Sequence, residues 1–104
     1  MHGYPVGWFA PHYKYLLEPW REFKRLLAPL VVRATETSKY IELQTGGRID
    51  FWTLDDTDAG RSYKYKRIVA DEAAMVPGLG EWWNEAGRPT LADFQGDAYF
   101  LSTP

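Results

Sequence analysis

The stretch Arg67–Ala74 constrains the fold of this chain most. A short apolar run, Ile68–Ala70, leads directly into two adjacent acids, Asp71 and Glu72. An apolar run of this length that stops at polar residues is typical of a buried strand. In nucleotide hydrolases, an acid at such a strand end holds Mg²⁺ and a second acid orients the attacking water. A solvated turn after a strand explains the local pattern equally well.

A second apolar run, Ala98–Leu101, is followed by Ser102 and Thr103. The carboxyl ends of parallel strands meet at one edge of a sheet, where α/β proteins place their chemistry. We therefore expect the hydroxyls of Ser102 and Thr103 to lie level with Asp71 and Glu72. Taken alone, a Ser-Thr-Pro sequence more often starts a turn.

The composition excludes several classes of protein. With 104 residues, the chain forms one domain at most. It has no cysteine, which excludes disulfides and thiolate metal sites. Its net charge of −2 lacks the strongly basic character of a nucleic-acid-binding module. No apolar run is long enough to span a membrane, and the N-terminus does not read as a secretory signal, so a cytoplasmic protein is expected.

Before the acid pair, the pattern predicts a strand, a helix and a hairpin. Tyr4–Ala10 reads as a buried strand. The helix is expected to begin near Glu18, with Pro19 in its first turn, and to end at Pro29. Its apolar face consists of Leu16, Trp20, Phe23 and Leu27, while Glu18, Arg21, Glu22 and Arg25 lie on the other side.

The segment Tyr40–Leu54 alternates between apolar and polar residues on both sides of Gly46-Gly47, which predicts an antiparallel hairpin. A three-residue loop with a glycine bulge keeps apolar residues opposite each other, whereas a two-residue turn does not. The pattern leaves open whether Leu43 lies opposite Ile49 or Phe51. A polar loop is expected over 55–66, and a partly helical segment over 82–93.

Two features of known nucleotide and metal sites are missing. No lysine follows a glycine, so the chain contains no P-loop to cradle a triphosphate. His2 and His12 have no partner at metal-ligand spacing. Of the five tryptophans, Trp8 and Trp20 fit core positions, whereas one of the neighbours Trp82 and Trp83 must leave a helix face.

Taken in order, six segments resemble the ATPase domain of the large terminase subunit of tailed phages. The segments are Val6–Tyr13, Ile41–Phe51, Asp58–Ser62, Ile68–Ala74, Pro89–Asp93 and Phe100–Pro104. Each is weak alone, but their order and spacing are fairly specific, and together they extend over nearly the whole chain.

The resemblance implies an α/β fold of the P-loop NTPase type with an additional strand. It comprises a parallel sheet, flanking helices and an inserted antiparallel hairpin. The sheet would be incomplete, because residues 1–104 match a partial domain. The P-loop strand and helix would precede it, and the rest of the ATPase domain and a nuclease domain would follow. The resemblance further implies an order for three strands. The strand before Ser102 would lie beside the strand that ends in Asp71 and Glu72, called the Walker B strand, and the strand of Tyr4–Ala10 would lie on the other side of the Walker B strand.

The resemblance also implies roles for individual residues. Glu72 would be the catalytic carboxylate, and Asp71 would help to coordinate Mg²⁺, through water. Ser102 and Thr103 would form the coupling motif that links ATP hydrolysis to DNA movement. Arg61 lies in a loop that usually reads Arg-Gly in the family, and here Ser62 replaces the glycine, which weakens any phosphate-sensing role for Arg61.

For the parent protein, the resemblance implies an ATPase that packages viral DNA into procapsids. ATP and Mg²⁺ would be its cofactors, and double-stranded DNA, the portal and the small terminase subunit its partners. It would work as a homo-oligomeric ring in the host cytoplasm, away from membranes. The chain alone is expected to be inactive because it has no P-loop. Two alternatives stay open, a fragment of another helicase-like ATPase and a small non-enzymatic interaction module.

Overall fold

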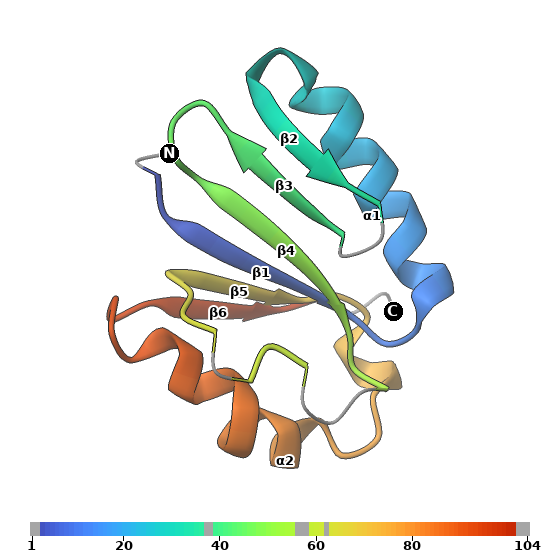
Figure 1. Cartoon of the computed structure of the whole chain (residues 1–104). Helices are drawn as coiled ribbons and strands as arrows, with labels where there is room; N and C mark the ends of the chain where they lie inside the picture. The colour runs from blue at the N-terminus through green and yellow to red at the C-terminus, as the bar shows by residue number, and fades with distance from the viewer. Residues whose placement is uncertain (1–2, 37–38, 56–58, 62, 102–104) are drawn as a thin grey trace.

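In the computed structural model, which describes residues 3–36, 39–55, 59–61 and 63–101, a six-stranded mixed sheet lies between two helical layers (Figure 1). The strand order is β2-β3-β4-β1-β5-β6. Helix α1 covers one face, and the segment that contains α2 covers the other. The strands are β1 (Pro5–Ala10), β2 (Val31–Thr35), β3 (Tyr40–Leu43), β4 (Arg48–Thr53), β5 (Arg67–Ala70) and β6 (Asp97–Phe100).

The parallel part of the sheet has the predicted order. Strand β1 pairs in parallel with both β4 and β5, and β5 pairs in parallel with β6. The order β6, β5, β1 expected from the resemblance is thus confirmed. Strand β1 is central and contributes to both cores, because its side chains alternate between the two faces. Phe9 belongs to the core under α2, and Ala10 to the core under α1.

The hairpin of β3 and β4 has the predicted three-residue loop, residues 44–46. Ile41 lies opposite Ile49, so apolar residues face each other across the pair. The Leu43 amide donates to the Gly47 carbonyl at 2.9 Å, so Leu43 lies opposite neither Ile49 nor Phe51. Gly46 has φ +89°, a left-handed conformation that glycine adopts at little cost.

Helix α1 spans Tyr13–Leu26 and is followed by a 3-10 turn, Ala28–Leu30. The predicted start near Glu18 is therefore wrong. Pro19 lies inside the helix, where it leaves the Tyr15 carbonyl without its usual amide donor. Leu16 and Trp20 are one turn apart and both buried in the same core cluster. Because their packing needs continuous helix on both sides of Pro19, it offsets the lost hydrogen bond.

Strand β2 was not expected from the sequence. It pairs antiparallel with β3 and forms one edge of the sheet, with a register shift between Val31 and Arg33. Its residues Val32, Arg33 and Ala34 are exposed. A short exposed edge strand gives neither the continuous apolar run nor the alternation of apolar and polar residues that indicate the other strands.

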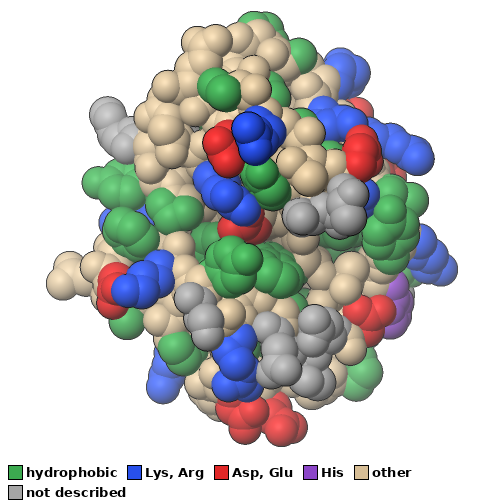
Figure 2. Space-filling model, in the orientation of Figure 1, with side chains coloured by type: hydrophobic (Ala, Val, Ile, Leu, Met, Phe, Trp, Pro, Cys, Tyr) green, Lys and Arg blue, Asp and Glu red, His purple; other side chains and the backbone are tan. Residues whose placement is uncertain are grey.

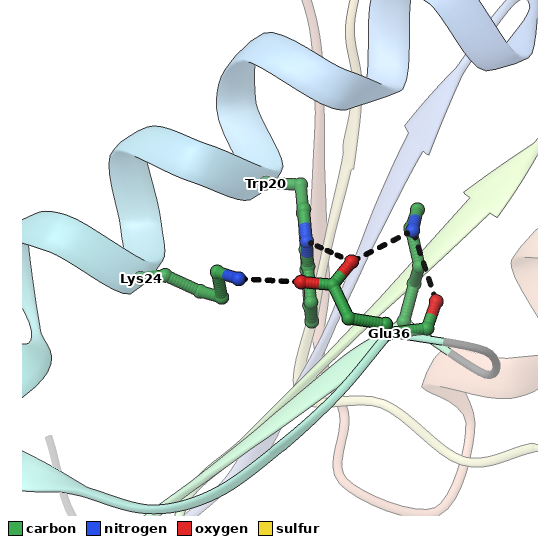
Figure 3. Close-up of polar contacts among 4 residues, drawn as sticks. Trp20, Lys24 and Glu36 are labelled. Atoms are coloured by element: carbon green, nitrogen blue, oxygen red, sulfur yellow. Dashed lines mark hydrogen bonds and ion pairs between the residues drawn. The ribbon is translucent and has the colours of Figure 1, made fainter.

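A carboxylate from the connection after β2 fixes α1 to this side of the sheet (Figure 3). Glu36 accepts hydrogen bonds from Trp20 Nε1 at 3.2 Å and from Lys24 Nζ at 2.6 Å. Lys39, only 7% exposed, donates to the Glu36 carbonyl and lies 5.2 Å from the Trp20 ring centroid. The Lys24 ammonium, more than the indole or Lys39, holds the pKa of Glu36 below its ordinary value.

The other face of the sheet is covered by residues 79–91, which comprise α2 (Leu79–Trp82), a π turn (Trp83–Gly87) and a 3-10 turn (Arg88–Leu91). The predicted partly helical segment 82–93 thus begins three residues earlier, at Leu79. Trp82 is buried and donates from Nε1 to the Ala59 carbonyl at 3.0 Å. Trp83 instead packs edge-on against Phe100 at the border of the sheet. Trp83 is half-buried and packs against the border of the core that contains Trp82, so only one of the two neighbours is fully buried.

A buried polar network joins β4 to the segment that leads into β5. The Tyr65 hydroxyl donates to Asp50 Oδ2 at 2.7 Å and accepts from Trp52 Nε1 at 2.8 Å. Arg48 Nε donates to the second Asp50 oxygen at 2.7 Å. Burial, and next the Asp50 carboxylate, raise the pKa of Tyr65, so its hydroxyl stays protonated and available as a donor. The network therefore holds its carboxylate fully paired.

Tyr65→Phe should destabilise the chain by about 1–3 kcal/mol, because two buried groups lose their partner. Urea unfolding measures the change. Tyr63→Phe is the matched control, since Tyr63 is the neighbouring ring but is 45% exposed, and its substitution should cost less than about 0.5 kcal/mol. Equal effects of the two substitutions would show that the network does not contribute.

The β6 edge of the sheet predicts self-association of the isolated chain. In the described part of the chain β6 is an outermost strand, and Tyr99, Phe100 and Leu101 are 48%, 46% and 44% exposed. An uncovered apolar edge pairs readily with another strand. Light scattering should show dimers or larger species that increase with concentration. Strictly monomeric behaviour at high concentration would contradict this prediction.

Candidate functional site

The acid pair lies at the carboxyl end of β5, as predicted. Strand β5 ends at Ala70, and Asp71 and Glu72 follow it directly. The Asp71 amide donates to the Phe9 carbonyl of β1 at 2.7 Å, so Asp71 is still held by the neighbouring strand. Both acids are half-buried. They occupy a fixed edge of the sheet, where α/β proteins bind ligands.

The end of β6 reaches the same place. The Leu101 amide donates to the Ala70 carbonyl at 2.9 Å, and the Ala73 amide donates to the Leu101 carbonyl at 2.8 Å. These two bonds bracket the acid pair. Ser102 and Thr103, the predicted partners of the acids, lie outside the described residues. Leu101, which precedes them, is hydrogen-bonded to Ala70 and to Ala73, the residues on the two sides of the acid pair.

Glu72 adopts an unusual backbone conformation. Its φ of 50° and ψ of 45° are left-handed, and it begins a 3-10 turn, Ala73–Met75. The Glu72 amide donates to Asp71 Oδ1 at 3.1 Å. A left-handed conformation in a residue with a side chain is retained only when its surroundings enforce it.

Helix α1 contributes further carboxylates that the sequence analysis did not assign to the site. Together with Asp71 and Glu72, one side of this helix lines a pocket of about 370 Å³; the helix residues that line it are Lys14, Tyr15, Glu18, Pro19 and Glu22. Glu18 and Glu22 had been assigned only to the polar side of the helix. Their spacing places them on one face, but the sequence carries no signal that this face points to the acid pair.

The pocket is electrostatically unfavourable for ionised Asp71. Burial raises the pKa of Asp71 most, the Glu72 carboxylate raises it further, and Glu18 adds a smaller effect in the same direction. The hydrogen bond from the Glu72 amide acts against this rise. A carboxyl group whose pKa is shifted by burial and by neighbouring carboxylates is typical of a functional site.

The structure does not bring Arg61 to this pocket. Arg61 Nη2 lies 4.0 Å from Glu85 Oε2, and Arg61 lines a separate depression with Tyr63, Lys64 and Thr90. Its predicted contact with a nucleotide therefore has no counterpart in the geometry of the acid pair. The role of Arg61 stays a prediction.

The donor set fits a magnesium ion that is held mostly by water and phosphate. Within the described residues, no three acidic, histidine or cysteine side chains converge tightly enough to hold a metal ion by themselves. Mg²⁺ loses its water reluctantly and is usually bound by one or two carboxylates together with substrate phosphates. Asp71 can supply one such carboxylate. The carboxylate of Glu72, the next residue, is then not needed as a ligand of the ion.

The fold matches solved structures closely. The ATPase domain of the large terminase of Thermus phage P74-26 matches with a TM-score of 0.76 at 23% sequence identity. The chain has the fold of a phage large terminase ATPase domain. An arginine-to-alanine variant of that domain matches with a TM-score of 0.70 at 20% identity. In each comparison the match covers 98% of this chain and 48% of the other, so the chain spans about half the length of these domains.

No family model matches the sequence, and neither does any curated protein. The terminase fold is thus recognised through the arrangement of the elements. Among the helices formed by described residues, none has the length and apolar character needed to cross a membrane.

Asp71→Asn should stabilise the chain at neutral pH. Because the folded-state pKa of Asp71 is raised, ionised Asp71 costs stability above that pKa, and the cost disappears as the pH falls through it. The gain from the asparagine should therefore shrink in acid. Urea unfolding across this pH range measures it, and asparagine keeps an oxygen for the Glu72 amide.

Asp97→Asn is the matched control. Asp97 pairs with Arg67 at 2.9 Å, and this guanidinium is the main cause that lowers the pKa of Asp97. Its substitution should leave stability unchanged or reduce it at neutral pH, and this effect should fade as the pH falls through the folded-state pKa. A loss of stability from Asp71→Asn at neutral pH would show that Asp71 is satisfied by its surroundings and is not strained.

Proposed function

We propose that this chain is part of a phage terminase large-subunit ATPase, which uses ATP hydrolysis to move DNA into procapsids. One observation carries the proposal. In a fold that matches a terminase ATPase domain, two adjacent acids lie at the carboxyl end of a central parallel strand, beside the end of its neighbour β6. The sequence resemblance implies such a position for the Walker B acids, Asp71 and Glu72.

In this proposal each acid has its own role. Asp71 holds the cation through a water molecule, and its raised pKa favours a site in which a cation neutralises the pocket. Mg²⁺ would supply the charge that draws the phosphate oxygens together. Glu72 accepts a hydrogen bond from the attacking water and orients it toward the phosphate. Ser102 and Thr103 couple the state of this site to DNA movement, while a phosphate contact for Arg61 has no geometric support.

The open edge of β6 supports the proposal that this chain is one part of a larger ATPase domain. A P-loop strand is expected to pair beside β6, where Tyr99, Phe100 and Leu101 are uncovered. A groove along this edge, lined by Trp83, Leu91, Ala98 and Phe100, continues the apolar surface below the strand. The missing half of the domain would cover both, since parallel sheets of this class are buried on both faces.

The surface charge fits a chain that acts within a larger assembly. Basic and acidic side chains are interspersed on the face shown in Figure 2, in keeping with a net charge of −2. In the proposed homo-oligomeric ring, most contacts to double-stranded DNA would come from other parts of the parent protein. The portal and the small terminase subunit are the further partners, in the host cytoplasm.

The decisive test restores a complete ATPase domain. In a chimera, this chain replaces the equivalent half of the Thermus phage domain, which contributes the remainder. Glu72→Gln should preserve ATP binding measured by calorimetry and reduce the rate of ATP hydrolysis roughly 10²–10⁴-fold. Glu81→Gln, in α2 on the other face of the sheet, is the matched control and should keep the rate of the unmodified chimera.

Wild-type hydrolysis by the Glu72→Gln chimera would reject the role of Glu72. The chain alone should show no measurable turnover, because nothing in it cradles a triphosphate. Turnover by the chain alone that Glu72→Gln abolishes would contradict the proposal that a separate P-loop segment is needed.

A further inference from the structure

We propose that the end of β6 sets the backbone conformation of Glu72, and therefore the position of its carboxylate, through one hydrogen bond. In this bond the Ala73 amide donates to the Leu101 carbonyl at 2.8 Å. Leu101 acts through its carbonyl as a positioning residue. The catalytic role of Glu72 rests on the proposed function above, whereas the backbone link can be measured without any nucleotide.

Glu72 needs such a constraint. Its φ of 50° is one of three positive values among the non-glycine residues that the structure describes. An extended or right-handed conformation is normally preferred by glutamate. Either alternative would turn the following peptide unit and move the Ala73 amide away from Leu101. The hydrogen bond and the left-handed conformation therefore require each other.

Two other contacts show how the backbone before Glu72 is held. On the side before Glu72, the Asp71 amide is fixed to the Phe9 carbonyl of β1 at 2.7 Å. The Glu72 amide donates to the adjacent Asp71 side chain at 3.1 Å. The fixed point after Glu72 is Ala73, which is bonded to β6. Glu72 thus forms a one-residue bridge between a strand end held by β1 and a turn held by β6.

Through this arrangement, a movement of the end of β6 can change the backbone conformation of Glu72. Because the Leu101 carbonyl accepts the bond from the Ala73 amide, any displacement of the end of β6 acts on this bond. Release of the Ala73 amide would let Glu72 relax to negative φ and withdraw its carboxylate. A small movement at the strand end is thus converted into a change between two discrete backbone states.

The test replaces single amides by esters, which removes one donor and leaves every side chain unchanged. An ester at Ala73 removes the proposed link. An ester at Leu101 is the matched control, since it removes the bond to the Ala70 carbonyl at 2.9 Å, which joins the same two strands. Both chains can be assembled by ligation of synthetic segments and studied by NMR.

The readout is the backbone of Glu72. A strong intraresidue NOE between its amide and α protons, together with its α-carbon shift, reports positive φ. We expect the Ala73 ester to lose this signature and the Leu101 ester to keep it, although both weaken the β5–β6 pairing to a similar extent. Leu101→Ala should also keep it, because the link uses the carbonyl.

Retention of positive φ in the Ala73 ester, or its equal loss in both esters, would overturn the proposal. A second measurement uses the unmodified chain, so that the proposal can still be tested if an ester variant does not fold. The Ala73 amide should show a through-bond coupling to the Leu101 carbonyl carbon and slow hydrogen exchange. Exchange at the rate of an unprotected peptide would overturn the proposal as well. Neither result depends on ATP hydrolysis, so the proposed function stands or fails separately.

Discussion

The parallel pairing of β1 with two neighbours is the constraint on which the rest of the structure depends. Because β4 and β5 run beside it in the same direction, the carboxyl ends of all three strands meet at one edge of the sheet. The side chains of β1 also alternate between the two cores, with Phe9 under the α2 layer and Ala10 under α1. Chemistry at that edge is therefore held by hydrogen bonds within the sheet and by packing on both of its faces.

The site combines this rigidity with unfavourable electrostatics. Carboxylates from α1 and from the turn after β5 share one pocket, and burial together with Glu72 and Glu18 raises the pKa of Asp71. Elsewhere, buried or clustered acids have cationic or hydroxyl partners; Asp50 is bonded by Arg48 and Tyr65, and Glu36 by Lys24. The contrast separates carboxylates that stabilise the fold from Asp71, whose ionised form the surroundings disfavour.

Local pattern predicted the parts of the fold in which one face of an element is buried. The strands around Val6 and Ile68 follow from short apolar runs, and the hairpin strand around Ile49 follows from alternation. The loop of the hairpin follows from the glycine at residue 46. The pattern failed where tertiary packing overrides local preference: Pro19 stays inside α1 because Leu16 and Trp20 pack on both sides of it. It also missed the exposed edge strand β2. The acid pair could be placed from the sequence, but Glu18 and Glu22 could not, because only the docking of α1 brings them to Asp71.

The two edge strands of the sheet, β2 and β6, differ in how readily another strand can pair with them. On β2, the register shift between Val31 and Arg33 interrupts the regular ladder that another strand would need. On β6 the ladder runs without a shift from Asp97 to Phe100. The sheet is thus closed to extension on one flank and ready for it on the other. A polypeptide that lengthens the sheet on this flank would pair with β6, the strand that leads to Leu101 and so to the carbonyl that anchors the turn after Glu72.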